Sequence, residues 1–269
     1  MRSIVMTLER RLETTLAAMA STRPVANLAA YDCVLLASKH LGLHERDAAM
    51  PFVLRALELD PDYARAQAML AIAHYVGFLQ TGDRGLIDLS LKAGRRAVAL
   101  DAVSSYCQGA LGNALTYKKN FELAGVHLAR AIALNPADSA ALGWEADRLL
   151  ALGRAEEALA VLDRVKEHDP IPPTWHWDIR ATAYLVLGRY DQAIMAMSRL
   201  VNLLWYNHAF LAVCLVKLGR LADAKAEVAK LLVAFPRMTV TQFRVAQYIF
   251  LDDLADIVDD ALRAAGLPE

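Results

Sequence analysis

A short phrase recurs at nearly regular intervals in the second half of the chain. Each copy reads Leu-Gly-Arg, with an alanine four positions after the arginine, at Leu152–Ala158, Leu187–Ala193 and Leu218–Ala224. The glycines of successive copies are 35 and 31 residues apart. A period of this size is typical of helical repeat arrays, in which each unit buries its apolar face only against its neighbours. We therefore expect function to lie on an extended helical surface.

A second recurring feature is an Asp-Pro or Asn-Pro pair that follows an alanine-rich segment, as at Asp60-Pro61 and Asn135-Pro136. The residue before a proline disfavours the α region, so such a pair ends a helix. Aligned on these stops, the chain is predicted to form about six helix pairs. They span residues 30–63, 64–104, 105–138, 139–173, 174–204 and 205–238. The second pair is longer than the others, which predicts a lengthened helix or loop around residues 78–85.

The two ends of the chain differ from the repeats. Residues 1–20 are predicted to form an amphipathic helix with Ile4, Leu8, Leu12, Leu16 and Met19 on one side, and Pro24 interrupts the linker that follows. After Pro236 we expect two further helices, the last with an acidic outer face that caps the array. The predicted divisions are an N-terminal helix and linker (1–29), a repeat array (30–238) and a helical cap (239–269).

Composition narrows the class of partner. The formal net charge of −1 provides no overall field for nucleic acid or an anionic membrane, so neither is an expected partner. The three cysteines are widely separated and odd in number, which favours buried thiols in a reducing compartment. We find no signal-peptide pattern and no apolar run of about 18 residues, so the predicted location is the cytoplasm.

The spacings resemble those of the tetratricopeptide repeat. The third unit matches through Leu111-Gly112, Ala124, Leu128, Ala131 and Pro136, and the fifth through Trp177, Ala181, Tyr184, Gly188 and Ala193. The first unit has Ala37 where the family has glycine. The resemblance covers about residues 30–238 and implies an all-α, right-handed α-α superhelix, a TPR-like solenoid with a C-terminal capping helix.

A narrower likeness concerns the segment from Ala29 to Ala64 and the closing residues 261–269. They look like the ends of a bacterial tetratricopeptide module that follows class III adenylate or guanylate cyclase domains, or winged-helix transcriptional regulators. Neither domain fits into the 29 residues before the repeats, so the likeness implies a regulatory half and carries over no cyclase activity.

Catalytic and metal-binding patterns are weak. We find no phosphate-binding glycine loop, no Gly-x-Ser-x-Gly and no Cys-x-x-Cys. His40 and His44 are four residues apart, but no third metal ligand is evident. Trp177 is expected to fill a packing position, whereas Trp175 is equally consistent with a ligand platform. No cofactor and no metal are expected, and an enzyme site built from residues 174–208 and 78–85 is only a third alternative.

In the tetratricopeptide family, certain positions of each first helix line a concave groove. Mapped onto this chain, the positions that we predict to bind a partner are Tyr75, Tyr106, Asn113, Tyr117, Trp144, Asp147, Trp175, Ile179, Tyr206 and Phe210. The basic residues with which some members hold a peptide carboxylate are missing. Aromatic side chains in their place favour an apolar helix or an extended segment.

The predicted function is therefore a non-catalytic protein–protein interaction module, regulatory in bacterial signalling, that binds an apolar peptide or helix in its concave groove. One alternative stays open. In this alternative, the chain is a homo-oligomerising scaffold, such as a homodimer, whose groove is filled by its own termini or by a second copy.

Overall fold

The computed structural model describes residue 16 and residues 29–168, 172–246 and 252–269, and within these ranges it contains α-helices and turns but no strand. The helices from residue 30 onward are α2 (Ala30–Leu41), α3 (Arg46–Leu59), α4 (Ala64–Thr81), α5 (Gly85–Leu100), α6 (Ser105–Tyr117), α7 (Phe121–Leu134), α8 (Ser139–Ala151), α9 (Ala155–His168), α10 (Thr174–Val186), α11 (Tyr190–Met197), α12 (Trp205–Lys217), α13 (Leu221–Ala234), α14 (Val240–Ala246) and α15 (Asp252–Ala264). The predicted all-α fold is confirmed over these ranges.

Each predicted helix pair is found within its expected range, from α2 and α3 to α12 and α13. In the second pair the extra length lies in the helices themselves, because α4 has 18 residues and α5 has 16. In the fifth pair α11 has only 8 residues. The helix predicted over residues 1–20 lies outside the described residues except for Leu16, which is helical and partly buried.

The glycine of the recurring Leu-Gly-Arg phrase makes the turn between the two helices of a pair. Gly153, Gly188 and Gly219 have φ angles of 75°, 68° and 74°, a left-handed conformation in which a side chain is strained. The amide of the next arginine donates to a carbonyl near the end of the first helix, as from Arg220 to Leu215 at 2.8 Å. In the third pair Lys119 takes this conformation, with φ of 60°. The phrase is therefore a turn sequence.

The second helices end where the sequence predicts. Asp60 and Asn135 lie just after α3 and α7 and are extended, with φ of −145° and −141°. Asp101 has the same conformation after α5 although no proline follows it. Its carboxylate accepts a hydrogen bond from the amide of Val103 at 3.0 Å, which closes the turn without proline.

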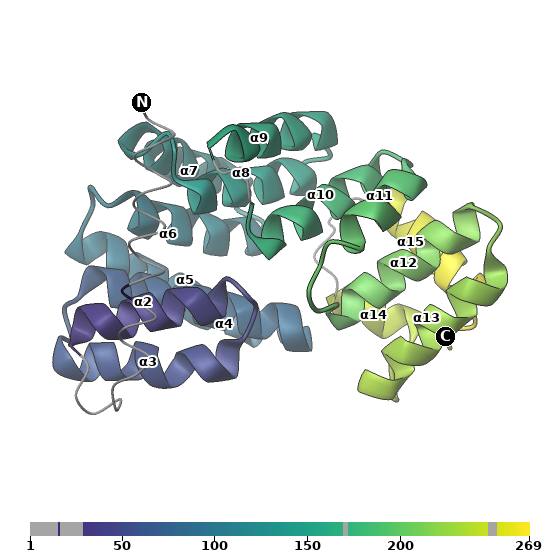
Figure 1. Cartoon of the computed structure of the whole chain (residues 1–269), viewed down its shortest axis with the longest axis horizontal. Helices are drawn as coiled ribbons and strands as arrows, with labels where there is room; N and C mark the ends of the chain where they lie inside the picture. The colour runs from purple at the N-terminus through teal and green to yellow at the C-terminus, as the bar shows by residue number, and fades with distance from the viewer. Residues whose placement is uncertain (1–15, 17–28, 169–171, 247–251) are drawn as a thin grey trace. The chain divides into compact units, whose positions relative to one another are not determined.

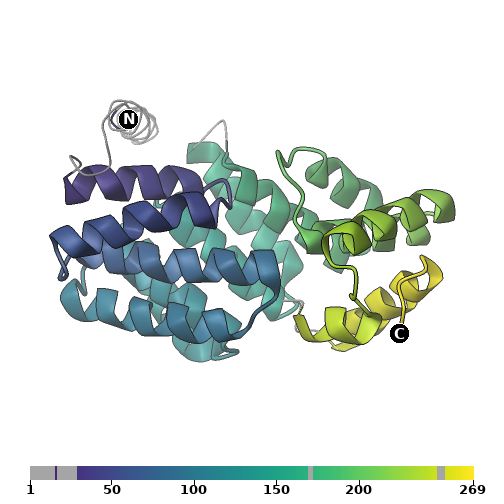
Figure 2. The same ribbon diagram turned by 90° about the horizontal axis from the view of Figure 1, so that it is seen from below.

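By its internal contacts the chain divides into two compact units, one of residues 1–148 and 161–172 and the other of residues 149–160 and 173–269. In the first unit α2 packs on α3 and α4, and α4 packs on α5 and α6 (Figure 1). In the second unit α10 packs on α11, and α12 packs on α11, α13 and α15 (Figure 2). Each unit is thus a stack of neighbouring helix pairs.

Small residues allow helices to approach closely both within a pair and between successive pairs. A Cβ atom on Gly112 would lie 2.6 Å from Leu128, and one on Gly94 would lie 3.1 Å from the backbone of Leu111. Ala124 and Ala131 are fully buried as well.

The three cysteines are buried, as expected, and burial raises the pKa of Cys214 to about 12. None of the helices among the described residues has the length and apolar character required to cross a membrane.

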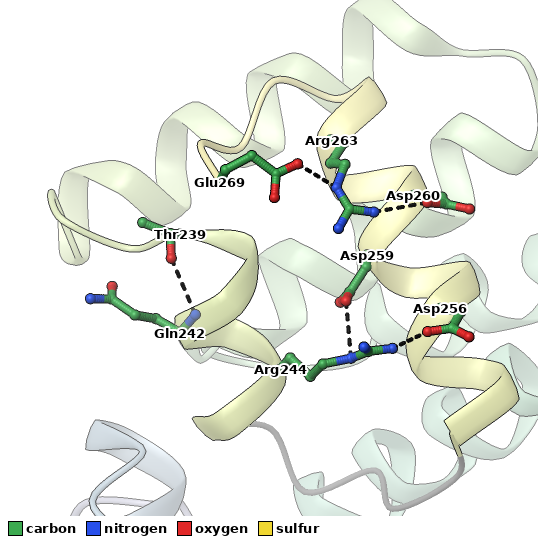
Figure 3. Close-up of polar contacts among 8 residues, drawn as sticks. All are labelled: Thr239, Gln242, Arg244, Asp256, Asp259, Asp260, Arg263 and Glu269. Carbon is green, nitrogen blue, oxygen red and sulfur yellow. Dashed lines mark hydrogen bonds and ion pairs between the residues drawn. The ribbon is translucent and has the colours of Figure 1, made fainter.

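The last two helices are joined by ion pairs (Figure 3). A backbone hydrogen bond also links the C-terminal residues to the start of α14. Arg244 of α14 pairs with Asp256 and Asp259 of α15, while Arg263 pairs with Asp260 and Glu269. The amide of Val240 donates to the carbonyl of Pro268 at 2.7 Å, so the C-terminal residues fold back onto the start of α14.

Asp259 departs from the expectation of a solvated acidic face. Only 4% of it is exposed, because its side chain lies between α14 and α15 and contacts Arg244 at 3.0 Å. Burial raises the pKa of this carboxyl, and the nearby charges of Arg244 and Arg263 offset only part of that increase.

Candidate functional site

The ten residues predicted to bind a partner all lie on first helices of the pairs, namely α4, α6, α8, α10 and α12. Those on α4, α6 and α8 belong to the first unit and those on α10 and α12 to the second, and in each unit we call the side of the first helices that carries them the first-helix face of that unit. Tyr106 and Trp175 are partly exposed, whereas the other eight residues have at most 9% of their surface exposed. The first-helix faces therefore offer two accessible aromatic side chains, and their remaining members are covered within the chain.

In the first unit, three side chains of this face meet through their polar ends. The hydroxyl groups of Tyr75 and Tyr117 lie 3.1 Å apart, and Tyr75 donates to the carboxylate of Asp147 at 3.4 Å. The rings of the two tyrosines are 4.9 Å apart. Because α4, α6 and α8 each contribute one residue, the cluster ties three successive repeats together on one side. It also places a carboxylate at a buried site, since Asp147 is only 8% exposed.

Tyr106 and Trp144 form the aromatic part of the same face. Their ring centroids are 5.4 Å apart in an edge-to-face arrangement. The guanidinium of Arg65 lies 4.0 Å from the ring centroid of Tyr106, which is a cation–π contact. A Cβ atom on Gly109 would be 2.5 Å from the ring of Trp144, so this glycine provides the space in which the indole packs. Arg65 was not predicted from the sequence, because it lies at the start of α4 among small residues.

Asn113 occupies the middle of α6 and is fully buried. Neither its amide nitrogen nor its carbonyl oxygen has a hydrogen-bond partner among the described residues. Leaving both ends of a buried amide unsatisfied costs free energy, and such groups are rare in folded proteins. Asn113 is therefore a polar group within the interior of the first unit.

In the second unit the face is closed by the cap. Phe210 is fully buried, with its ring 5.8 Å from that of Tyr206 and 6.1 Å from that of Phe243 in α14. The ring of Trp205 also meets that of Phe243 edge-to-face, with centroids 5.4 Å apart. Tyr206 and Phe210 thus belong to the core beneath the cap, since α14 brings an aromatic side chain onto α12. Trp175 and Ile179 remain on α10, where Ile179 is 7% exposed.

Asp178 is a buried acid that the sequence reasoning missed. It is 7% exposed and accepts hydrogen bonds from the hydroxyl of Tyr206 at 2.5 Å and from the amide of Asn207 at 2.7 Å. An acidic residue between Trp177 and Ile179 on a predicted first helix was the available signal. Asp178 joins α10 to α12 and fixes the position of Tyr206.

His176 and the two tryptophans beside it differ in how far they are exposed. His176 is fully buried, while Trp175 and Trp177 are both partly exposed. The guanidinium of Arg199 lies 5.6 Å from the ring centroid of Trp177, which covers part of that indole. One side of the Trp177 ring therefore packs within the protein, and the other contacts the guanidinium of Arg199.

The ionisable groups do not gather into a metal site within the described parts of the chain. His40 contacts Glu45 at 2.7 Å, and His44 lies in the turn after α2 with φ of 60°. Burial lowers the pKa of His74 and of His127, which belong to different helices. Of the segments considered for an enzyme site, residues 78–85 belong to the first unit and residues 174–208 to the second.

Comparison with known proteins supports this interpretation of the fold. Residues 115–176 match the family model described as tetratricopeptide repeat. A chain of the crystallised APC/C hetero-tetramer Cut9–Hcn1 is similar with a TM-score of 0.62 and 16% identity, and the match covers 94% of this chain and 46% of that one. The chain therefore spans less than half the length of that relative.

A second structure, a thermophilic tetratricopeptide repeat protein of Thermus thermophilus, has a TM-score of 0.50 and 21% identity. That match covers 76% of this chain and 100% of the other. Identities at this level show a shared fold alone. Comparison with proteins of curated function gives no match. The likeness to cyclase or winged-helix regulators stays a prediction.

Proposed function

We propose that this chain, built of tetratricopeptide repeats, is a non-catalytic protein-interaction module that binds an apolar or amphipathic peptide segment on a first-helix face. The observation that carries the proposal is that each unit has a partly exposed aromatic side chain on a first helix, Tyr106 in the first unit and Trp175 in the second. Aromatic anchors of this kind supply most of the binding energy at protein interfaces. The match of residues 115–176 to the tetratricopeptide repeat supports a protein-binding role. The resemblance of residues 29–64 and 261–269 to the ends of bacterial regulatory modules is what favours a regulatory role in bacterial signalling.

The environment of Tyr106 suits an anchor. Its ring is held by the edge contact with Trp144 and by the cation–π contact with Arg65, and its hydroxyl donates to the sulfur of Met69 at 3.4 Å. A side chain that is already ordered loses little entropy on binding. An incoming apolar group would add contacts to the exposed part of the ring without rearranging its neighbours.

The test is a peptide-binding measurement on the full chain. Amphipathic helical peptides are selected from a displayed library, and the affinity of the best peptide is measured by calorimetry for wild type, Tyr106→Ala and Trp175→Ala. Each substitution is expected to weaken binding by about tenfold or more, as for an interface hot spot.

Val126→Ala is the control, because Val126 is 64% exposed but lies on the second helix α7. It should leave the affinity unchanged, and circular dichroism confirms that every variant is folded. Equal affinities for wild type and both aromatic variants would refute the proposed face. Dimerisation that depends on concentration in place of peptide binding would favour the scaffold function.

A further inference from the structure

Helix α14 (Val240–Ala246) is held on the second unit by few of its own side chains. Of its seven residues, Val240 and Phe243 are the buried ones, with 1% and 0% of their surface exposed. A helix this short has little stability of its own, so its place depends on its contacts with the rest of the unit. Helix α15 differs, because it buries a continuous apolar side that consists of Leu254, Ala255, Val258, Ala261 and Leu262. Of the two cap helices, α14 is therefore the one that leaves with the smaller loss of buried apolar surface.

Phe243 of α14 packs into a group of aromatic rings at α12. Its ring meets those of Trp205 and Phe210 edge-to-face, with centroids 5.4 and 6.1 Å apart. The ring of Phe235, just after α13, lies 5.6 Å from that of Trp205. Phe210 is one of the positions at which the sequence predicts a partner. Helix α14 thus places its own aromatic side chain where a side chain of the partner is expected.

Arg244, the next residue, faces α15. It pairs with Asp256 and with Asp259, and its Nε lies 3.0 Å from Oδ2 of Asp259 (Figure 3). Asp259 is only 4% exposed, and its Oδ1 is buried without a hydrogen-bond partner among the described residues. Burying a carboxylate is costly unless its oxygens are paired, so this site favours a basic side chain. A guanidinium that contacts both oxygens would satisfy Asp259 more fully than Arg244 does.

From these contacts we propose that α14 is an intramolecular ligand of the second unit, and that the partner of this unit is an amphipathic helix with an aromatic residue followed by an arginine, which takes the place of α14 on α12 and α15. The inference rests on the proposed function, because it specifies the chemistry of the segment that binds the second unit. Helix α14 is tethered to α13, so it competes at a high effective concentration. A longer partner helix offsets this advantage, because it is more stable as a helix and can contact both oxygens of Asp259.

The first experiment measures whether α14 leaves while the rest of the unit stays folded. Arg244→Glu places a third carboxylate beside Asp256 and Asp259 and so repels α14 from α15. Hydroxyl-radical footprinting of the full chain is expected to show at least about fivefold more oxidation of Trp205 and Phe210 than in wild type, as when a local opening exposes buried side chains. The matched control is Arg237→Glu, an exposed arginine that precedes α14, and it should behave as wild type.

Met197 of α11, which is 2% exposed, is the internal reference and should stay protected in every variant. Unchanged oxidation of Trp205 and Phe210 in Arg244→Glu would overturn the inference. A rise that includes Met197 would overturn it as well, because α14 would then leave only when the whole unit unfolds.

The second experiment supplies α14 as a separate peptide. The probe consists of residues 236–246, carries fluorescein and is held helical by a hydrocarbon staple between Thr241 and Val245, which are both exposed in α14. Fluorescence anisotropy should show that the probe binds the Arg244→Glu chain at least about tenfold more tightly than wild type, because the site is open more often.

Two altered probes test the chemistry of recognition. Probes with Phe243→Ala or with Arg244→Ala should each bind the Arg244→Glu chain at least about tenfold more weakly than the original probe. Equal binding of the original probe to both chains would overturn the inference. Binding that survives either substitution in the probe would also overturn it, because the aromatic residue and the arginine would then not be what the site recognises.

The selected peptide separates this inference from the proposed function. If Tyr106→Ala and Trp175→Ala weaken its binding while the α14 probe binds both chains equally, the inference fails and the proposed function stands. If the α14 probe behaves as expected while neither substitution affects the selected peptide, Tyr106 and Trp175 fail as anchors and the site beneath α14 stands.

Discussion

At the scale of single residues, the contact between Gly109 and Trp144 shows how the first-helix face depends on a missing side chain. A Cβ atom on Gly109 would lie 2.5 and 2.6 Å from two carbons of the indole, which is closer than real carbon atoms approach. Trp144 is 8% exposed, so its ring has little room to move away. The glycine thus determines where the indole lies and, through the edge contact, how Tyr106 is presented.

We predict that Gly109→Ala lowers the free energy of unfolding by about 2 kcal/mol, the usual cost of overpacking a core. Urea denaturation measures the change. In a Trp144→Ala background the same substitution should cost much less, because the clashing ring is gone. Equal losses in both backgrounds would contradict the proposed origin of the strain.

At the scale of elements, the turns between paired helices explain the recurring Leu-Gly-Arg sequence. Gly219 has φ of 74°, and an added Cβ would meet nothing within 4 Å, so any penalty there comes from the backbone alone. We predict that Gly219→Ala costs about 1 kcal/mol of unfolding free energy. Thermal or urea denaturation tests this value.

Gly42 provides the matched control for Gly219. It also follows a first helix, but its φ is −63°, and an added Cβ would meet atoms no closer than 3.4 Å. Gly42→Ala should change stability by less than about 0.5 kcal/mol, or increase it slightly. If both substitutions cost the same, the left-handed turn is not what the glycine supplies.

The contact between α12 and α13 includes an acid whose titration is predictable. Burial alone would raise the pKa of Glu227, but hydrogen bonds from Lys230 at 2.6 Å and from His208 at 2.7 Å outweigh it and lower the pKa below its ordinary 4.5. A lowered carboxyl pKa in the folded state adds stability above the unfolded value, and this stability is lost as the pH falls through the folded value.

We therefore predict that Glu227→Gln is less stable than wild type by roughly 1 kcal/mol near pH 6 and that the difference shrinks below pH 4.5. Stability measured against pH in wild type and variant tests the prediction. A gap between wild type and Glu227→Gln that widens on acidification would contradict the assignment.

At the scale of the whole molecule, the periodic sequence was sufficient to predict the order and ranges of the helix pairs. Helix ends are local features, set by a left-handed glycine such as Gly188 or by an extended residue such as Asn135. The sequence pattern did not predict which positions on the first helices are buried by other helices. Phe210 occupies a position that lines the groove in the repeat family, yet Phe243 from a non-repeat helix packs against it. Asp178 was missed because its partners, Tyr206 and Asn207, lie 28 and 29 residues away in sequence.

The central claim of this account is that recognition takes place on the first helices of the pairs. The most direct measurement is a hydroxyl-radical footprint of the full chain with and without the tightest selected peptide. The account predicts that the peptide protects Tyr106 and Trp175 and leaves Val126 and Val233, exposed on the second helices α7 and α13, as reactive as before. Protection of Val126 or Val233 with unchanged reactivity of both aromatic side chains would contradict it.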